Sequence, residues 1–341
     1  MFNNVYRLTG VRQFERVTTN QDLYTQNRVI VRPTLMSICR ADERYYTGVR
    51  DKKVLEERLP MSLIHEAIGE VVQDNTGSIK PGTRVVMIPT VAHGHDNLVA
   101  DNYLKSSKFS SSTLDGFMRE YVFMQPENLV EIPVASQSDI NVLLEVASVA
   151  VQAIRRLKDN MINRVQTLGI WGDGNVAYMM AVVAKEFFPN IDIYVFGKHA
   201  DKLAYISFTH TMQIDRIPDD LKIDHAIEAV GGLGSESAID QIIDHINPRG
   251  TVVLAGVSEK PVAINTRMVL EKGIDLVGTT RSTHQDFETA IRLMGNSMEM
   301  RERLQLMIQN IKSVEKVSDI SKAFDEDLNM NWGKTVIEWN M

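Results

Sequence analysis

The residues best suited to chemistry are a single cysteine, one histidine and two glutamates. Cys39 stands 26 positions before the pair His65-Glu66, and Glu145 follows later in an apolar stretch. A thiolate, an imidazole and carboxylates suit one zinc ion, and a catalytic zinc takes about three protein ligands and keeps one position open. A lone cysteine forms neither an internal disulfide nor a four-cysteine zinc site. The set Cys39, His65, Glu66 and Glu145 therefore predicts a catalytic zinc, with a packed, metal-free thiol as the alternative.

A second group of residues forms a glycine turn. The segment Gly172-Asp173-Gly174-Asn175-Val176-Ala177 follows an apolar run and precedes a helical pattern. In this context the first glycine permits a tight turn, the second lets the backbone approach a pyrophosphate, and a small third residue lets helix and strand pack closely. The helix N-terminus then binds the anion. We expect a dinucleotide site formed by Gly172, Gly174, Asn175, Val176 and Ala177.

The end of the next strand-like run indicates which dinucleotide binds. The segment 195–199 contains no acidic residue where an NAD site places one on the ribose 2′-hydroxyl. An aspartate beside a 2′-phosphate would bring like charges together, whereas Gly197 leaves room and Lys198 or His199 can pair with the phosphate. We therefore expect NADP(H), with Gly197, Lys198 and His199 in the site. The alternative is that the basic residues are only solvated residues at a helix start.

The remaining pattern predicts the elements that position these residues. Up to about residue 145, short β-type runs broken by turn residues indicate an irregular, mostly β domain. Apolar residues at helical spacing predict a helix over 139–158. From residue 166, strand-like runs alternate with helical stretches, which is typical of a parallel, doubly wound sheet. The tail from residue 285 is expected to hold two helices and a final strand, and the serine-rich segment 106–113 an exposed loop.

Bulk properties exclude some classes of function. A length of 341 residues allows roughly two domains. The net charge of −7 argues against a protein that binds nucleic acid through a basic surface. The sequence has no run of about 18 uncharged apolar residues and no leader pattern at its start. We expect a cytoplasmic protein with neither membrane nor nucleic-acid partners.

Several motifs, in order along the chain, resemble the zinc-containing medium-chain dehydrogenase/reductase family. The matching stretches are 38–42 around Cys39, 60–69 with His65-Glu66, 80–85, Glu145, the turn at Gly172, 228–232 and 248–253. The resemblance implies an α/β protein with a GroES-like, mostly β catalytic domain, a Rossmann domain, and an active site between the two. We place the GroES-like domain at 1–148, the Rossmann NADP-binding domain at 149–286, and a C-terminal segment that returns to the catalytic domain at 287–341.

The resemblance also assigns roles to individual residues. It implies that Cys39 and His65 are zinc ligands, that Glu66 is the neighbouring glutamate, and that Glu145 is the ligand used by the polyol-dehydrogenase branch. Three departures matter. No cysteine-rich lobe follows Pro89, so we expect no structural zinc; Ile64 replaces the usual glycine before the histidine; and Ala41 replaces the residue whose hydroxyl often relays a proton. The candidates for the proton relay are then water, Glu66, Tyr45 and Tyr46.

Basic residues near the metal-binding cysteine indicate an anionic substrate. Arg40 directly follows Cys39, and Arg44 and Lys53 come soon after. A guanidinium at position 40 can hold an anion through two parallel hydrogen bonds, which favours a phosphorylated sugar or polyol. The resemblance implies NADPH-dependent, zinc-assisted reduction of D-ribulose 5-phosphate to D-ribitol 5-phosphate for teichoic-acid synthesis. It further implies a homodimer or homotetramer and, by pathway logic, association with a ribitol-5-phosphate cytidylyltransferase.

Two other functions remain open from the sequence. In the first, the chain is a zinc-dependent polyol or alcohol dehydrogenase that acts on an unphosphorylated substrate, and the basic residues are only surface residues. In the second, it is a zinc-free, NADPH-binding regulatory or partner protein. The quartet Cys39, His65, Glu66 and Glu145 argues against the second.

Overall fold

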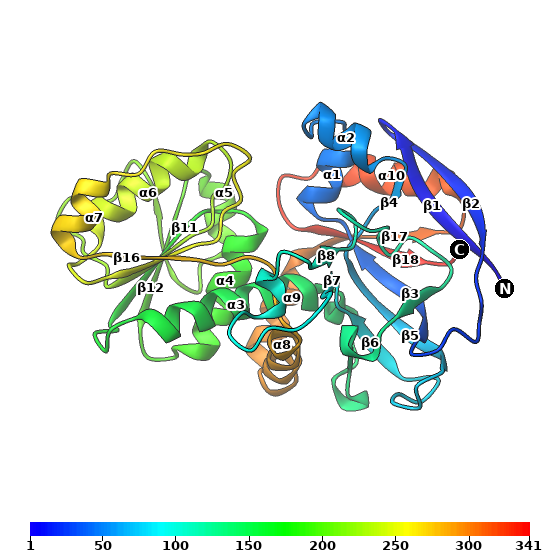
Figure 1. Cartoon of the computed structure of the whole chain (residues 1–341). Helices are drawn as coiled ribbons and strands as arrows, with labels where there is room; N and C mark the ends of the chain where they lie inside the picture. Colours follow the sequence, from blue (N-terminus) through cyan, green and yellow to red (C-terminus); the bar gives the residue numbers. More distant parts are fainter. The chain divides into compact units, whose positions relative to one another are not determined.

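The computed structural model describes all 341 residues, which form two compact units. One unit contains Met1–Glu145 together with Ser282–Met341, and the other contains Val146–Arg281. The first unit is therefore discontinuous in sequence, because the chain leaves it after Glu145 and returns at Ser282 (Figure 1).

The discontinuous unit is mostly β. Its largest sheet has the strand order β10-β6-β5-β3-β18-β17, with β9 also paired to β3. A second sheet has the order β2-β1-β4, and β7 pairs with β8. The strands are β1 (Phe2–Gly10), β2 (Gln13–Asn20), β3 (Val29–Ser37), β4 (Met61–Ser62), β5 (Glu66–Asp74), β6 (Arg84–Met87), β7 (Thr90–Val91), β8 (Lys108–Phe109), β9 (Val122–Met124), β10 (Leu129–Glu131), β17 (Ile308–Val314) and β18 (Lys334–Trp339).

The helices of this unit lie between strands along the chain and pack against its core. The unit contains α1 (Arg40–Tyr46), α2 (Lys52–Arg58), α8 (His284–Asn296), α9 (Met298–Met307) and α10 (Val317–Leu328). In the core, the rings of Phe14, Tyr46 and Phe324 pack together, with Tyr46 and Phe324 centroids 4.8 Å apart. Residues near both ends of the chain thus share one core.

Strand β18 connects the returning segment to the sheet. It pairs in parallel with β17 and antiparallel with β3, so that Val336 lies opposite Ser37 and Ile337 opposite Met36. The expectation of two helices in the tail was wrong, because α8, α9 and α10 are three. Ser297 ends α8 and caps α9 by accepting the N–H of Met300, and this cap divides what looked like one helical stretch.

The unit Val146–Arg281 is a doubly wound α/β domain. Its six strands are all parallel in the order β13-β12-β11-β14-β15-β16, and helices flank the sheet on both sides (Figure 1). This order confirms the predicted Rossmann sheet. The elements are α3 (Leu144–Asn160), β11 (Thr167–Trp171), α4 (Asn175–Phe187), β12 (Asp192–Gly197), α5 (Ala200–Tyr205), β13 (His210–Gln213), β14 (His225–Glu228), α6 (Gly234–His245), β15 (Thr251–Leu254), α7 (Thr266–Lys272) and β16 (Asp275–Gly278).

The position of β11 in the sheet fixes where a ligand binds. Its neighbours are β12 on one side and β14 on the other, so the winding direction reverses at β11. Ligands of open α/β sheets bind beyond the carboxyl ends of the strands at such a reversal. The glycine turn directly follows β11 and therefore lies at this point.

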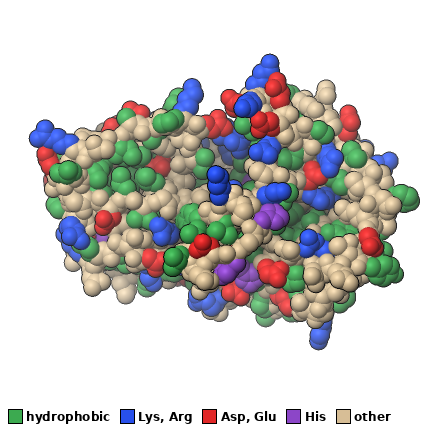
Figure 2. Space-filling view, viewed as in Figure 1, with side chains coloured by type: hydrophobic (Ala, Val, Ile, Leu, Met, Phe, Trp, Pro, Cys, Tyr) green, Lys and Arg blue, Asp and Glu red, His purple; other side chains and the backbone are tan.

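Charges of both signs are mixed on the surface of the protein. Lys and Arg side chains are interspersed with Asp and Glu over the face shown in Figure 2. None of the helices is long and apolar enough to span a membrane.

Candidate functional site

The backbone around His65 is held by a neighbouring segment. Between β4 and β5 the chain runs through Leu63 and Ile64, and the N–H groups of Gly116 and Phe117 donate to the carbonyls of Ser62 and Ile64 at 2.7 and 2.8 Å. A Cβ at position 116 would lie 2.1 Å from the Leu63 carbonyl oxygen. Only glycine permits this approach, so residue 116 helps to place His65.

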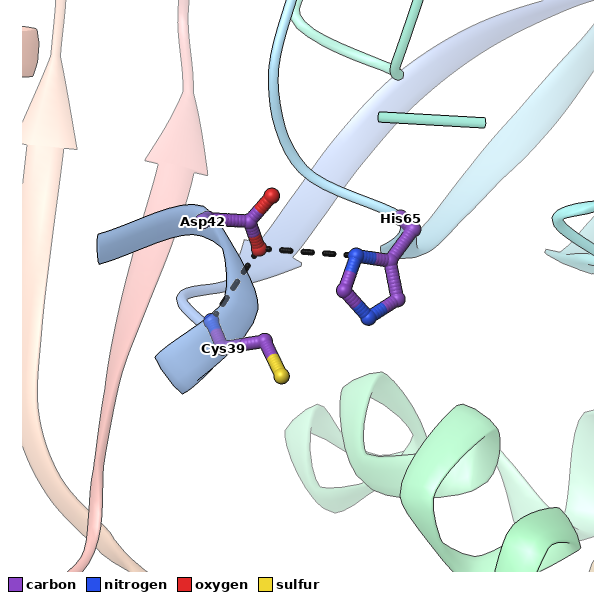
Figure 3. A group of neighbouring side chains, drawn as sticks. All are labelled: Cys39, Asp42 and His65. Atoms are coloured by element: carbon purple, nitrogen blue, oxygen red, sulfur yellow. Dashed lines mark hydrogen bonds and ion pairs between the residues drawn. The ribbon is translucent and has the colours of Figure 1, made fainter. Parts of the chain in front are cut away.

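Cys39 and Asp42 lie at the start of α1, facing His65 (Figure 3). Cys39 is the N-cap residue, and its backbone N–H donates to Asp42 Oδ2 at 3.3 Å. The same oxygen lies 3.5 Å from His65 Nδ1. The carboxylate of Asp42 therefore fixes the orientation of the imidazole and leaves Nε2 for a metal, the usual arrangement around a metal-binding histidine.

The other oxygen of Asp42 stabilises an unusual backbone conformation. Oδ1 accepts the backbone N–H of Ile64 at 3.0 Å and the hydroxyl of Ser111. Ile64 has a φ of +67°, a left-handed conformation that is costly for a β-branched residue and that glycine would adopt freely. Asp42 thus holds in place the turn that carries His65.

Ser111 corrects one expectation. The segment 106–113 was expected to be an exposed loop, and this was wrong at its centre, where Ser110 and Ser111 are buried. The hydroxyl group of Ser111 donates to the fully buried Asp42, so this part of the segment lies in a polar interior.

Glu66 is engaged by two residues of the same unit. The Ser37 hydroxyl donates to Oε2 of Glu66, and Lys334 Nζ lies 2.7 Å from Oε1. The Glu66 and Lys334 side chains are almost completely buried. Both oxygens therefore already have partners, which makes Glu66 less available to a metal than Cys39, His65 or Glu145.

Glu145 completes the group of donors. It is the second residue of α3 and the last residue of the first segment of the discontinuous unit, and it is buried. Burial, reinforced by the charges of Glu66 and Asp42 against those of His65 and Lys334, raises the pKa of Glu145 to about 7. A divalent cation beside this carboxylate would favour its ionised form.

Donor atoms gather around His65 in two overlapping groups. The ligand atoms of Cys39, Asp42 and His65 lie within 4.8 Å of one another, and so do those of His65, Glu66 and Glu145. His65 belongs to both groups. Sulfur, nitrogen and carboxylate donors suit zinc, and Cys39 from the first group and Glu145 from the second would provide about three ligands together with His65.

The electrostatics of His65 agree with this arrangement. Burial alone would lower the pKa of His65, but the charges and hydrogen bonds of Asp42 and Cys39 outweigh it and raise the pKa well above its ordinary value. For Asp42, burial acts to raise the pKa, but His65, Ser111 and Ile64 outweigh it and lower the pKa. The pocket thus favours a positive charge at His65, which a metal ion would supply.

The two candidate tyrosines are buried in the core. The Tyr46 hydroxyl donates to Asp325 at 2.9 Å, and burial together with Asp325 raises the pKa of Tyr46 to about 12. Its proton is therefore strongly held. The Tyr45 ring packs under the guanidinium of Arg50, 4.9 Å from the ring centroid.

The residues predicted to bind phosphate lie on two short helices. Arg40 and Arg44 belong to α1, and Lys53 belongs to α2. Arg40 is 80% exposed at its side chain and forms an ion pair with the buried Glu43. Lys53 is also exposed, with Glu57 at 4.0 Å.

The partner of Arg40 has a shifted pKa. Burial and the neighbouring Asp327 raise the pKa of Glu43 to about 7, although Arg40 acts to lower it.

The glycine turn has the geometry that a dinucleotide site needs. Gly172 has a φ of +139°, and a Cβ there would lie 2.9 Å from the Ala229 carbonyl and 3.2 Å from the Ala177 Cβ. Gly174 is the N-cap of α4, and no atom lies within 4 Å of where its Cβ would be. The predicted roles of these two glycines follow from this backbone. Asn175, Val176 and Ala177 begin α4.

A pocket of about 230 Å³ lies beside this turn. It is lined by predicted cofactor residues, namely Gly172, Gly174, Gly197, Lys198 and His199, and by others that include Asp173 and Gln241. Behind it, the buried Glu228 accepts the N–H groups of Val230 and Gly231 at 2.8 and 3.0 Å and fixes the loop after β14. The structure brings five of the predicted cofactor residues together around one cavity, whereas Asn175, Val176 and Ala177 are not among its lining residues.

Several residues of these sites were not assigned a role from the sequence, and they include Asp42, Lys334 and Asp173. Asp42 and Asp173 both lie within the motifs named above. Asp42 also stands three positions after an N-cap, where an acidic residue is a recognisable signal for a helix start. Nothing in the sequence connects Lys334 to Glu66, which lies 268 positions earlier.

Two family models match the chain. The model described as "Alcohol dehydrogenase GroES-like domain" matches residues 25–134, and the model described as "Zinc-binding dehydrogenase" matches residues 200–296.

Curated relatives match over the whole length. The chain is 45% identical to a ribulose-5-phosphate reductase of Bacillus spizizenii over 342 residues, covering 100% of both chains. It is 46% identical to ribulose-5-phosphate reductase 1 of Staphylococcus aureus, again covering 100% of both chains. Among solved structures, S. aureus TarJ in complex with NADPH has a TM-score of 0.89 at 42% identity, with 100% of each chain covered. Galactitol-1-phosphate dehydrogenase of Escherichia coli has the same fold, with a TM-score of 0.81 at 16% identity over 98% of this chain and 99% of that one.

Proposed function

The chain belongs to the zinc-binding dehydrogenase family, in the group of the ribulose-5-phosphate reductases, and we propose that it reduces D-ribulose 5-phosphate to D-ribitol 5-phosphate with NADPH. The observation that carries the proposal is the full-length match to reductases of that substrate. The donor group around His65 and the pocket at the glycine turn support it, because they provide for one metal ion and one dinucleotide. The resemblance inferred from the motifs is thereby confirmed.

The metal site is proposed to consist of Cys39, His65 and Glu145. Zinc bound there supplies a Lewis acid for the substrate carbonyl oxygen, where negative charge develops as hydride arrives. Asp42 holds the imidazole of His65, and Lys334 with Ser37 holds Glu66. Because Ala41 has no hydroxyl group, we propose that the proton reaches the alkoxide through water.

The proposed reduction needs one hydride and one proton, and each has a source. The hydride for C2 of the ketose would be supplied by bound NADPH, which would leave as NADP⁺. One proton from solvent converts the resulting alkoxide to the hydroxyl group of ribitol 5-phosphate. The turn from Gly172 to Ala177 binds the pyrophosphate of the cofactor at the start of α4.

We assign the substrate phosphate to Arg40, Arg44 and Lys53. Phosphate binding away from the reacting carbon orients C2 and uses binding energy to raise the rate. Arg40 forms an ion pair with Glu43 through one guanidinium nitrogen, so the others remain for phosphate oxygens.

The proposal also covers the location of the protein, its oligomeric state and its partner. The chain would act in the cytoplasm as a homodimer or homotetramer. Its product would supply a ribitol-5-phosphate cytidylyltransferase for teichoic-acid synthesis, with which it would associate.

The test is NADPH oxidation followed by absorbance. D-ribulose 5-phosphate and D-ribulose are compared in zinc-loaded protein and after treatment with a chelator, with sorbitol and xylitol assayed in the oxidative direction. We expect turnover that requires both the phosphate and zinc, and that returns when zinc is added back. Equal turnover of D-ribulose, or oxidation of sorbitol in preference, would instead indicate a dehydrogenase for unphosphorylated polyols.

A further inference from the structure

An acidic residue of the glycine turn reaches across to the end of the neighbouring strand. Oδ2 of Asp173 accepts the backbone N–H groups of Lys198 and His199 at 2.7 and 2.8 Å. The same oxygen lies 2.9 Å from Nδ1 of the His199 ring. The Asp173 side chain is only 15% exposed. One carboxylate oxygen thus fixes both the backbone and the side chain of the segment after β12.

Asp173 occupies the space that a side chain at position 197 would need. A Cβ on Gly197 would lie 2.5 Å from the Asp173 Cβ and 2.9 Å from Oδ2. Position 197 is where an NAD site carries its acidic residue at the end of the second strand. In this chain, the carboxylate beside the end of β12 is that of Asp173 in the glycine turn. Position 197 must be glycine to leave room for it.

The three residues face a common pocket. Asp173, Lys198 and His199 line the cavity of about 230 Å³ at the glycine turn, together with Gly174 and Gln241. His199 is 55% exposed at its side chain, and its Nε2 has no partner in the chain. The ring is therefore held at one nitrogen and leaves the other for a ligand.

Two roles are chemically open to this carboxylate. It either accepts the ribose 2′-hydroxyl of NADH, as the strand-end acid of an NAD site does, or it positions the His199 ring beside the cofactor. The contacts favour the second role, because Oδ2 already has three donors from Lys198 and His199. Burial acts to raise the pKa of Asp173, but the hydrogen bonds from His199 and Lys198 outweigh it and lower the pKa, so the group is ionised near neutral pH.

We propose that Asp173 is a positioning residue for cofactor selectivity, which orients His199 to bind the 2′-phosphate of NADPH. The proposal rests on the function proposed above, since it explains how this chain recognises the cofactor of that reaction. Recognition of the 2′-phosphate then depends on a pair formed between the turn and the strand end. It does not depend on a basic residue alone.

The experiment compares cofactor binding by Asp173→Asn, His199→Gln and the double variant. Asparagine keeps the shape and an acceptor for the backbone N–H groups but removes the charge that orients the ring. Dissociation constants for NADPH and NADH are measured by fluorescence titration of zinc-loaded protein. We expect each single variant to weaken NADPH about tenfold, the loss of one charge-assisted hydrogen bond, and to leave NADH nearly unchanged. Because Asp173 acts through His199, the double variant should be no weaker than His199→Gln.

Kinetics separate positioning from damage to the fold. In Asp173→Asn the KM for NADPH should rise while kcat at saturating NADPH stays the same. Asp201→Asn is the matched control, because it removes an equal charge from an exposed position in the first turn of α5. It should leave the preference for NADPH unchanged.

Each other result has a distinct meaning. NADPH binding that is unchanged or tighter in Asp173→Asn overturns the inference, since the carboxylate would then only repel the phosphate. Additive losses in the double variant also overturn it. Wild-type protein without any preference for NADPH would count against the proposed cofactor itself, and not only against the role of Asp173.

Discussion

Lys334 Nζ lies 2.7 Å from Oε1 of Glu66, and the two side chains are 4% and 1% exposed. Burial by itself would lower the pKa of Lys334, but the charges of Glu66 and Cys39 outweigh it and raise the pKa above its ordinary value. Glu66 begins β5 and Lys334 begins β18. A buried ion pair thus links the metal-binding region to the last strand of the sheet.

Replacement of Lys334 by methionine should destabilise the zinc-loaded protein. The change leaves the Glu66 carboxylate buried without its cation, which typically costs about 3–5 kcal/mol. Urea unfolding measures the loss. The double variant Lys334→Met/Glu66→Gln should recover much of it, because no unpaired charge remains. Losses that simply add in the double variant would show that the two residues do not act as a pair.

Asp42→Asn should weaken zinc binding about 10- to 100-fold, the usual effect of removing the partner of a metal-binding histidine. Asparagine still accepts the N–H of Ile64, so the turn keeps its shape while His65 loses its carboxylate. Competition with a chromogenic chelator gives the affinity. Ser111→Ala removes a different partner of Asp42 and serves as the control, with a smaller effect expected. Unchanged zinc affinity in Asp42→Asn would contradict the orienting role.

The single cysteine provides a direct readout of metal binding. Cys39 is the only thiol in the chain and is partly exposed. We expect zinc to protect it from a thiol reagent and a chelator to restore one reactive thiol per chain, while NADPH binding stays the same in both states. Cys39→Ser should neither label nor retain reductase activity. Equal labelling rates with and without zinc would remove Cys39 from the ligand set.

Arg40→Ala should act on the phosphate and not on the carbonyl chemistry. We expect kcat/KM for D-ribulose 5-phosphate to fall about 10- to 100-fold, the loss of a charged hydrogen-bonded contact, and the slow turnover of D-ribulose to change little. Arg58→Ala is a suitable control, because that arginine lies at the end of α2 and has no predicted role. An equal loss for both substrates would refute the phosphate assignment.

Acid should reveal the contribution of Asp224 to stability. Burial acts to raise its pKa, but hydrogen bonds from Gln166, Asn247, Thr167 and Arg164 outweigh it and hold the pKa below the ordinary value of 3.8. The ionised form therefore stabilises the folded state above pH 4, and this contribution is lost as the pH falls through the folded-state pKa. Asp224→Asn should cost about 1–3 kcal/mol at pH 7, and the difference from wild type should shrink below pH 4 in urea unfolding. A difference that does not depend on pH would show that shape, not charge, matters at this position.

The sequence predicted the parts of the molecule that depend on local pattern. The alternation of strand-like and helical segments after residue 166 correctly predicted the parallel sheet. Gly172 has the positive φ that a glycine in this turn indicated. Local pattern failed where partners lie far apart. The pairing of β18 with β3 and the contact between Lys334 and Glu66 depend on which segments meet in space. The left-handed Ile64 was also unexpected, because its conformation depends on a hydrogen bond that its N–H donates to a residue 22 positions earlier.

The discontinuity of the first unit sets an order for assembly during synthesis. Residues 146–281 form a continuous unit whose six strands all come from one stretch of chain, so it can fold as soon as that stretch has left the ribosome. The unit with the metal ligands must wait, because β18 fills the position between β3 and β17 and brings Lys334 to Glu66. Until residue 339 is available, residues 35–37 of β3 lack their β18 partner and Glu66 has no buried cation. The nascent protein should therefore acquire its nucleotide site before its metal site.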